Sequence, residues 1–200
     1  MSEKITETLS APVDTDALAR LRARLTASAE ADGLLDIAYT TVDSPVGSLL
    51  LAATERGLVR VAYAREDHDG VLEALAQKLS PRVLRAPWRL DDAARELDEY
   101  FEGRRTAFDL DLDHALSHGF RQLVQSRLPE IGYGTTLSYK QVAELVGSPA
   151  AVRAVGTACA TNPLPVVVPC HRVVKSDGGI GQYVGGVEAK AALLELESAA

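Results

Sequence analysis

The hydrophobic and polar positions of the chain change their period along its length. From Asp36 onward, three short runs alternate with period two, separated by the turn signals SPVG and ERG. These runs, IAYTTVD, SLLLAAT and LVRVAYA, predict an antiparallel meander. Helix-like segments follow at 68–80 and 91–103, and TAFDLDLD at 106–113 alternates like an edge strand. The pattern predicts a small α+β domain over residues 35–115.

Residues 1–34 precede this domain as an extension. A polar start leads into Leu18, Leu21 and Leu25 at near-helical spacing, which predicts a solvated helix without a chemical role. The first residues have neither an apolar core nor a small-residue cleavage site, so we expect no secretory signal and a cytoplasmic location. Two cysteines in such a chain argue against a disulfide framework.

Residues 116–200 show mainly helical periodicity and predict a second domain. A helix over 118–131 has five apolar residues on its expected inner face: Phe120, Leu123, Val124, Leu128 and Ile131. SYKQVAELV and PAAVRAVGTACA then predict two short helices joined by a tight turn, with Pro149 in the first turn of the second helix. Such a pair is typical of a helix-turn-helix. The predicted fold class is therefore α+β, with an antiparallel-sheet domain followed by a mostly helical domain.

The outer face of the second short helix carries small residues and one cation. Ala150, Arg153, Ala154 and Thr157 follow one another at helical spacing. A reader of the major groove usually presents several long polar side chains. This face instead favours close approach to a minor groove, with Arg153 long enough to enter a base stack. A plain solvated helix face is the alternative interpretation.

Composition and charge limit the possible partners. Hydrophobic content of 46% and charged content of 24% are typical of a globular protein, and no apolar run is long enough to span a membrane. The net charge of −7 argues against nucleic acid. However, residues 1–119 hold 14 basic and 22 acidic side chains (−8), whereas residues 120–200 hold 7 and 6 (+1). The helical domain can therefore approach a duplex, with modest affinity.

The segment TNPLPVVVPCHRVV holds the chemistry that the sequence offers. We predict that Val166–Val168 is a buried strand that delivers Cys170 to the start of a loop. A buried cysteine is often only a small apolar residue, but the neighbouring His171 and Arg172 favour a thiolate. Because adjacent residues of an extended segment point to opposite sides, a water bridging Cys170 and His171 is easier than direct contact.

The last helix supplies an acidic partner for such a base. In projection, Glu197 falls between Leu193 and Leu194, on the inward arc, where a carboxylate needs a partner such as His171. A solvated last turn is the alternative. Lys190 projects into the same arc and is expected to extend out to solvent. We expect no metal site, because the cysteines and histidines lack ligand spacing, and no phosphate-binding loop motif is present. The first domain shows no chemistry.

The motifs TNPLP, PCHRVV, SDGGIGQYVGG, LSYKQVAELVG and AAVRAVG together resemble the O6-alkylguanine-DNA alkyltransferases. Their order and spacing agree from about Phe120 to Glu197. The resemblance implies a protein that flips an alkylated guanine out of double-stranded DNA and transfers the alkyl group, once and irreversibly, to its own Cys170. No cofactor is implied. The expected partner is DNA with alkylated bases, bound by a monomer. Cooperative binding and O4-alkylthymine repair stay open.

The same resemblance implies roles for individual residues. Cys170 is the alkyl acceptor, His171 is a base acting through water, Glu197 orients His171, and Asn162 braces the site. Tyr139 presses on the phosphate beside the target and donates a proton to the leaving guanine. Arg153 fills the vacated stack from a helix in the minor groove. Residues of one loop close over the base: Tyr183, Val184 and Gly185.

Three features depart from the family pattern. Gln125 replaces a frequent Trp, Val184 replaces Ser or Ala, and the extension to Gly33 has no counterpart in compact members. The first two leave the preferred alkyl size open.

Three other functions stay open. A non-catalytic alkyltransferase-like protein that only binds lesions would have Trp at the position of Cys170. A helix-turn-helix regulator would need polar base readers, and a Cys–His hydrolase is poorly served by adjacent Cys and His.

Overall fold

A computed structural model describes residues 14–198 of the chain and divides it into two compact units. The first unit ends at Leu35 and the second begins at Asp36. The only helix described in the first unit is α2 (Thr15–Ala31), where the Asp14 carboxylate accepts hydrogen bonds from the first-turn amides. This helix confirms the predicted helical extension over its described part, whereas residues 1–13 lie outside the described range.

The second unit begins with a four-stranded sheet in the order β3-β2-β1-β4. Its strands are β1 (Ile37–Val42), β2 (Leu49–Thr54), β3 (Gly57–Tyr63) and β4 (Val83–Arg85). The first three form the predicted antiparallel meander. The predicted antiparallel sheet is confirmed for these three strands, and the fourth strand makes the sheet mixed, because β4 pairs in parallel with β1. Three residues are too few to show an alternating pattern, so the sequence did not reveal β4.

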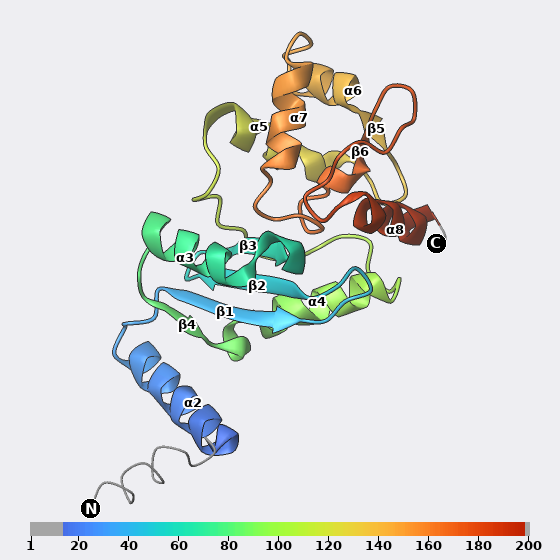
Figure 1. Cartoon of the computed structure of the whole chain (residues 1–200). Coiled ribbons are helices and arrows are strands. Elements are labelled where there is room, and N and C mark those ends of the chain that lie inside the picture. The colour runs from blue at the N-terminus through green and yellow to red at the C-terminus, as the bar shows by residue number, and fades with distance from the viewer. Residues whose placement is uncertain (1–13, 199–200) are drawn as a thin grey trace, which may run out of the picture. The chain divides into compact units, whose positions relative to one another are not determined.

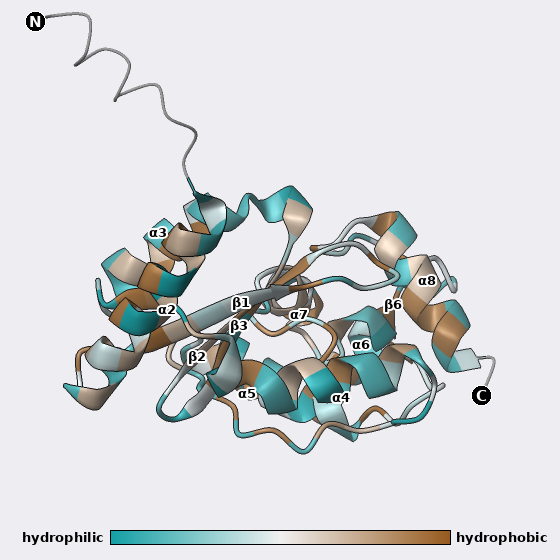
Figure 2. Cartoon of the chain, turned by 90° about the horizontal axis from the view of Figure 1, so that it is seen from below, coloured by the Kyte–Doolittle hydropathy of each residue, from teal (hydrophilic) through white to brown (hydrophobic). Residues whose placement is uncertain are grey.

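Helices cover both faces of this sheet. Figures 1 and 2 show α3 (His68–Lys78) on one face and α4 (Asp91–Phe101) on the other. On the α3 side, Leu75 packs with Ile37, Ala52 and Val59 in one buried cluster. The 3-10 turns of this part are η1 (Ala64–Glu66) and η2 (Pro87–Leu90). Double coverage explains why β2 is almost entirely buried: its residues form a continuous apolar run and not the period-two alternation expected for it from the sequence.

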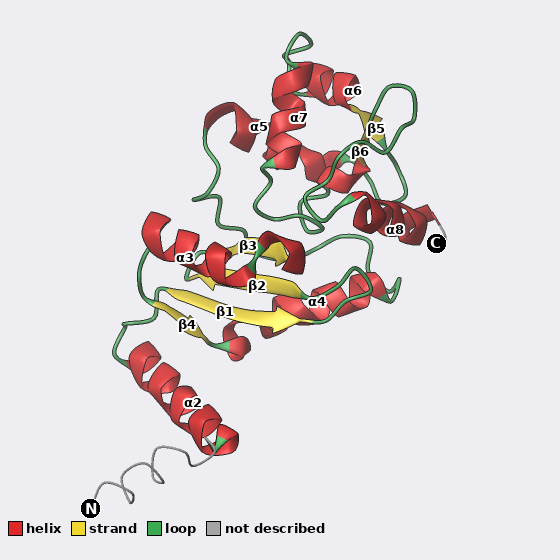
Figure 3. Cartoon of the chain, viewed as in Figure 1, coloured by secondary structure: helices red, strands yellow, loops and turns green. Residues whose placement is uncertain are grey.

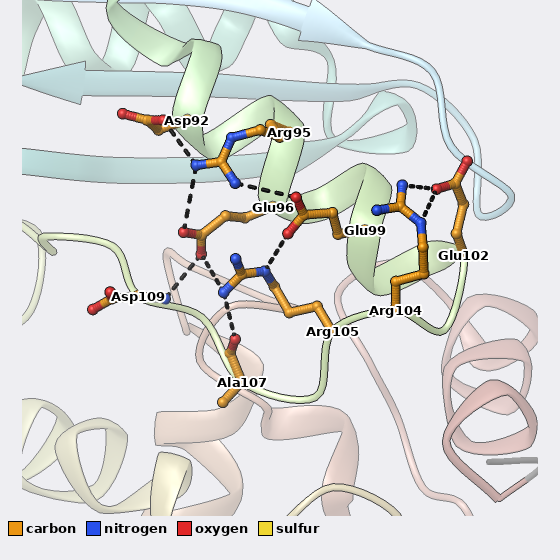
Figure 4. A network of polar contacts seen from close by, with 9 residues as sticks. All are labelled: Asp92, Arg95, Glu96, Glu99, Glu102, Arg104, Arg105, Ala107 and Asp109. Atoms are coloured by element: carbon orange, nitrogen blue, oxygen red, sulfur yellow. Dashed lines mark hydrogen bonds and ion pairs between the residues drawn. The ribbon is translucent and has the colours of Figure 1, made fainter.

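The segment after α4 is not the predicted edge strand. Residues 106–113 alternate in burial, but they make only an isolated bridge between Leu58 and Leu112. Figure 4 shows what holds the segment instead: buried Glu96 accepts a hydrogen bond from the Asp109 amide at 2.8 Å and contacts Arg105 at 3.3 Å. Contacts with α4 therefore hold this segment in place of hydrogen bonds to a neighbouring strand. Both arrangements give the same alternation of buried and exposed side chains.

The remaining elements are mostly helical, as Figure 3 shows. They are α5 (Gly119–Arg127), η3 (Leu128–Glu130), β5 (Leu137–Ser138), α6 (Tyr139–Leu145), α7 (Val152–Ala160), η4 (Cys170–Arg172), β6 (Val173–Val174) and α8 (Val187–Ser198). The pair α6 and α7 forms the predicted helix-turn-helix, but α7 begins after Pro149, which lies in the connecting turn. Strands β5 and β6 form a short parallel pair. No helix within residues 14–198 has the length and apolarity to cross a membrane.

The inner face of α5 differs from the prediction at two positions. Leu123 is 45% exposed, and Gln125 is buried in its place. The Gln125 side chain accepts a hydrogen bond from Ser117 and donates one to the Ala158 carbonyl of α7 at 2.9 Å. Gln125 therefore ties α5 to α7, a role that an apolarity pattern cannot indicate.

Candidate active site

A turn built around Asn162 delivers the nucleophile candidate. The buried Asn162 side chain accepts from the Leu164 amide at 3.1 Å and donates to the Val168 carbonyl at 2.8 Å. Val166 adopts a positive φ of 72°, so Val166–Val168 is not the predicted strand. Its burial was predicted correctly, but the flanking prolines and the Asn162 amide bend the segment into a turn.

Cys170 is the first residue of η4 and is 2% exposed. Asn162 Nδ2 lies 3.2 Å from its Sγ atom and can donate a hydrogen bond to it. Burial raises the pKa of the Cys170 thiol to about 11, although Asn162 and the Lys190 ammonium oppose the rise. Burial thus opposes the thiolate that the neighbouring residues were expected to favour, and the guanidinium of Arg172 pairs with Glu197.

His171 is fully buried beside a carboxylate. Its Nε2 atom lies 2.8 Å from Glu197 Oε1, which brings together the two residues paired in the sequence analysis. Burial lowers the pKa of His171 despite the opposing effect of Glu197, so the ring is neutral near pH 7. An ionised Glu197 must accept the Nε2 proton, which leaves Nδ1 as the basic nitrogen. Nδ1 has no hydrogen-bond partner within residues 14–198.

Glu197 lies at the centre of a buried polar network, as the helical projection of α8 predicted. Arg172 donates to it from Nε and Nη2, both at 2.9 Å, and Tyr100 Oη donates at 2.7 Å. Burial alone would raise the pKa of Glu197, but the hydrogen bonds from His171 and Arg172 lower it to about 2. The sequence analysis missed Tyr100, which lies on α4, and the pairing of Arg172.

Two more polar side chains reach this region from α6 and α8. Lys190 is fully buried and donates to the Val173 carbonyl at 2.5 Å, so the expectation that it extends to solvent was wrong. Its Nζ lies 6.0 Å from the centre of the Tyr139 ring. Burial raises the pKa of Tyr139 to about 12, so this phenol keeps its proton at neutral pH.

The loop before α8 borders the site. Tyr183 is buried, its ring lies 6.3 Å from that of His171, and its hydroxyl lies 3.0 Å from that of Tyr63 on β3. Val184 and Gly185 are half-buried. The first domain, which seemed to lack chemistry, thus contributes Tyr63 and Tyr100 to the surroundings of the site. A pocket of about 570 Å³ lies beside Asn162 and Val184.

The face of α7 singled out in the sequence is open to solvent. Arg153, Ala154 and Thr157 are exposed, as is Ala150 in the preceding turn. The opposite side of α7 is buried through Val155 and Cys159. The helix ends at Ala160, two residues before Asn162, so this face adjoins the turn that holds the nucleophile candidate. Within residues 14–198, no three His, Cys, Asp or Glu side chains group as metal ligands would.

Two sequence families match the chain and together cover most of it. The 6-O-methylguanine DNA methyltransferase ribonuclease-like domain matches residues 37–114, and the DNA binding domain of the same family matches residues 119–199. Residues before Ile37, including α2, lie outside both matches.

Individual relatives agree with this assignment. The methylated-DNA–protein-cysteine methyltransferase of Mycobacterium tuberculosis is 39% identical over 161 residues, which cover 80% of this chain and 92% of that protein. The enzyme of the same name from Methanosarcina barkeri is 37% identical over 159 residues, covering 80% and 96%. The crystal structure of Mycobacterium tuberculosis OGT in complex with DNA superposes with a TM-score of 0.70 at 36% identity, covering 81% of this chain and 93% of that one. This chain therefore belongs to the 6-O-methylguanine DNA methyltransferase family: it is a DNA-repair methyltransferase with both domains of that family.

Proposed function

We propose that this protein repairs O6-alkylguanine in double-stranded DNA by moving the alkyl group to Cys170, once per protein molecule. One observation carries this proposal: a single buried cluster holds Cys170 Sγ against the Asn162 amide and pairs the adjacent His171 with Glu197. The cluster thus contains a thiol, a neutral base with a free nitrogen, and a carboxylate to stabilise that base when it becomes charged.

The reaction is a displacement at the alkyl carbon. His171 Nδ1 accepts the thiol proton through a bridging water, and Glu197 offsets the charge of the resulting imidazolium. A bond forms between Sγ and the alkyl carbon as the bond from that carbon to O6 breaks. The Tyr139 hydroxyl, still protonated at neutral pH, supplies a proton to the departing guanine. The product thioether has no carbonyl that water could attack, so the protein is consumed, and no cofactor takes part.

The target base must leave the duplex, because the O6 atom lies inside the helix. Extrusion of a base costs roughly a few kcal/mol. In our proposal α7 enters the minor groove, and its small residues Ala150, Ala154 and Thr157 permit close approach. Arg153 replaces the lost stacking, while Tyr139 presses on the neighbouring phosphate. Tyr183, Val184 and Gly185 then close over the extruded base. We expect a monomeric cytoplasmic protein to carry this out.

Arg153→Ala should slow transfer from duplex DNA by roughly tenfold or more, because the vacated stack stays empty. Reaction with the free base O6-methylguanine, which needs no extrusion, should keep the wild-type rate. Arg153→Lys serves as the charge-matched control. Its transfer rate from duplex DNA should lie between those of the wild type and Arg153→Ala. Quenched-flow kinetics on both substrates measure these rates. An equal loss on duplex and free base would contradict the role of Arg153.

Titration with duplex that carries tritiated O6-methylguanine tests the proposed stoichiometry. We expect protein-bound label to plateau at one methyl group per protein molecule, without further release of repaired DNA. Continued repair beyond that plateau would contradict irreversible transfer. Binding of the duplex without any label on the protein would indicate a lesion-binding protein instead.

A further inference from the structure

Strand β3 contacts both segments that flank the proposed nucleophile. It is an edge strand of the sheet, so one side has no neighbouring strand. On that side the Val61 amide donates to the Pro163 carbonyl at 2.9 Å, and Arg60 Nη1 donates to the same oxygen at 3.1 Å. The turn that presents Cys170 is thereby attached to the first domain.

The last residue of β3 contacts the other segment. A Cβ atom placed on Gly185 would lie 2.6–2.7 Å from three carbons of the Tyr63 ring, which is closer than real contacts allow. Because φ of Gly185 is not positive, glycine is needed here for close approach and not for its backbone freedom. The Tyr63 hydroxyl also lies 3.0 Å from that of Tyr183, and both side chains are buried.

Tyr63 itself is held in place. Its amide donates to Glu66 Oε1 at 2.9 Å, and Glu66 forms an ion pair with Arg60. Since Arg60 also binds the Pro163 carbonyl, one continuous set of contacts joins the nucleophile turn to Gly185. The rings of Tyr63 and Tyr183 meet edge to face, with centres 5.7 Å apart.

We infer that Tyr63 is a positioning residue for alkyl transfer: its ring and hydroxyl fix residues 183–185 over the thiol. This inference rests on the proposed function, in which that loop closes over the extruded base. The ribonuclease-like domain then sets the shape of a pocket whose reactive groups belong mainly to the other domain. A misplaced loop costs reaction rate because the alkyl carbon no longer lies in line with Sγ.

Tyr63→Phe tests the hydroxyl alone, since the ring stays against Gly185. We expect the transfer rate at saturating O6-methylguanine duplex to fall about tenfold, the effect of one buried hydrogen bond. Duplex affinity, measured in the Cys170→Ala background, should be unchanged. The pH dependence of Cys170 alkylation by iodoacetamide without DNA should also be unchanged, because Asn162 and the His171–Glu197 pair are intact. Tyr39→Phe, on β1 of the same sheet, is the matched control and should leave transfer unchanged.

A double-mutant cycle tests the ring contact. Gly185→Ala should slow transfer by more than Tyr63→Phe does, because its methyl group overlaps the ring. In a Tyr63→Leu background the same Gly185→Ala change should cost much less, since the ring is gone. Wild-type transfer for Tyr63→Phe, or additive effects in the cycle, would overturn the inference. Failure of the wild-type protein to alkylate Cys170 in the same series would overturn the proposed function instead.

Discussion

Cys170→Ala should abolish methyl transfer while the protein still binds duplex that carries O6-methylguanine. The substitution removes one sulfur from a well-packed turn, and the contacts of Asn162 with Leu164 and Val168 persist without it. Labelled-methyl transfer and fluorescence anisotropy with a damaged duplex measure the two properties separately.

The second thiol of the chain provides the matched control. Cys159 is buried on the inner side of α7, whereas it is Cys170 whose Sγ lies against the Asn162 amide and which adjoins the His171–Glu197 pair. Cys159→Ala should therefore retain transfer to Cys170. Residual transfer in Cys170→Ala, or loss of transfer in Cys159→Ala, would contradict the assignment of Cys170 as the acceptor.

Glu197→Gln should lower the free energy of unfolding by about 3–5 kcal/mol, the usual cost of removing one partner from a buried ion pair. Arg172 is 5% exposed and would lose its only acidic partner among the described residues. Transfer should also slow, because a neutral amide cannot offset the charge on His171. Urea unfolding at pH 7 measures the loss. Glu130→Gln, which breaks a solvent-exposed pair with Arg127, should cost less than about 1 kcal/mol.

The pH dependence of stability provides a second measure of the same carboxylate. The pKa of Glu197 is lowered from 4.5 to about 2, so its contribution is fully present above pH 4.5. As the pH falls from 4.5 toward 2, the folded protein loses this contribution, which amounts to roughly 3 kcal/mol. The stability difference between wild type and Glu197→Gln should shrink over that window. A constant difference would mean that the ionised carboxylate is not what stabilises the fold.

Sequence periodicity located those parts of the site that lie on regular elements. The helical projection placed Glu197 inward because α8 is a regular helix, and the structure confirms its burial. The same spacing identified the exposed face of α7. Lys190 was interpreted wrongly because periodicity gives direction but not depth: its amine meets the Val173 carbonyl before it can reach solvent.

The periodicity of hydrophobic residues could not predict irregular backbone or contacts between residues that are distant in the sequence. A β-branched run between prolines looks like a strand, but Asn162 supplies hydrogen bonds that a neighbouring strand would otherwise provide. The burial that raises the pKa of Cys170, and the pairing of Arg172 with Glu197, both depend on the tertiary fold and do not follow from adjacency in the sequence. Tyr100 and Tyr63 meet their partners across 97 and 120 residues of sequence. No local signal indicates such pairings.

Intact-protein mass spectrometry, after incubation with excess duplex that carries one O6-methylguanine, tests the central claim most directly. The account predicts a gain of one methyl group, about 14 Da, with peptide mapping that places it on Cys170 and no further reaction. An unchanged mass with the duplex still bound, or a methyl group on any other residue, would contradict it.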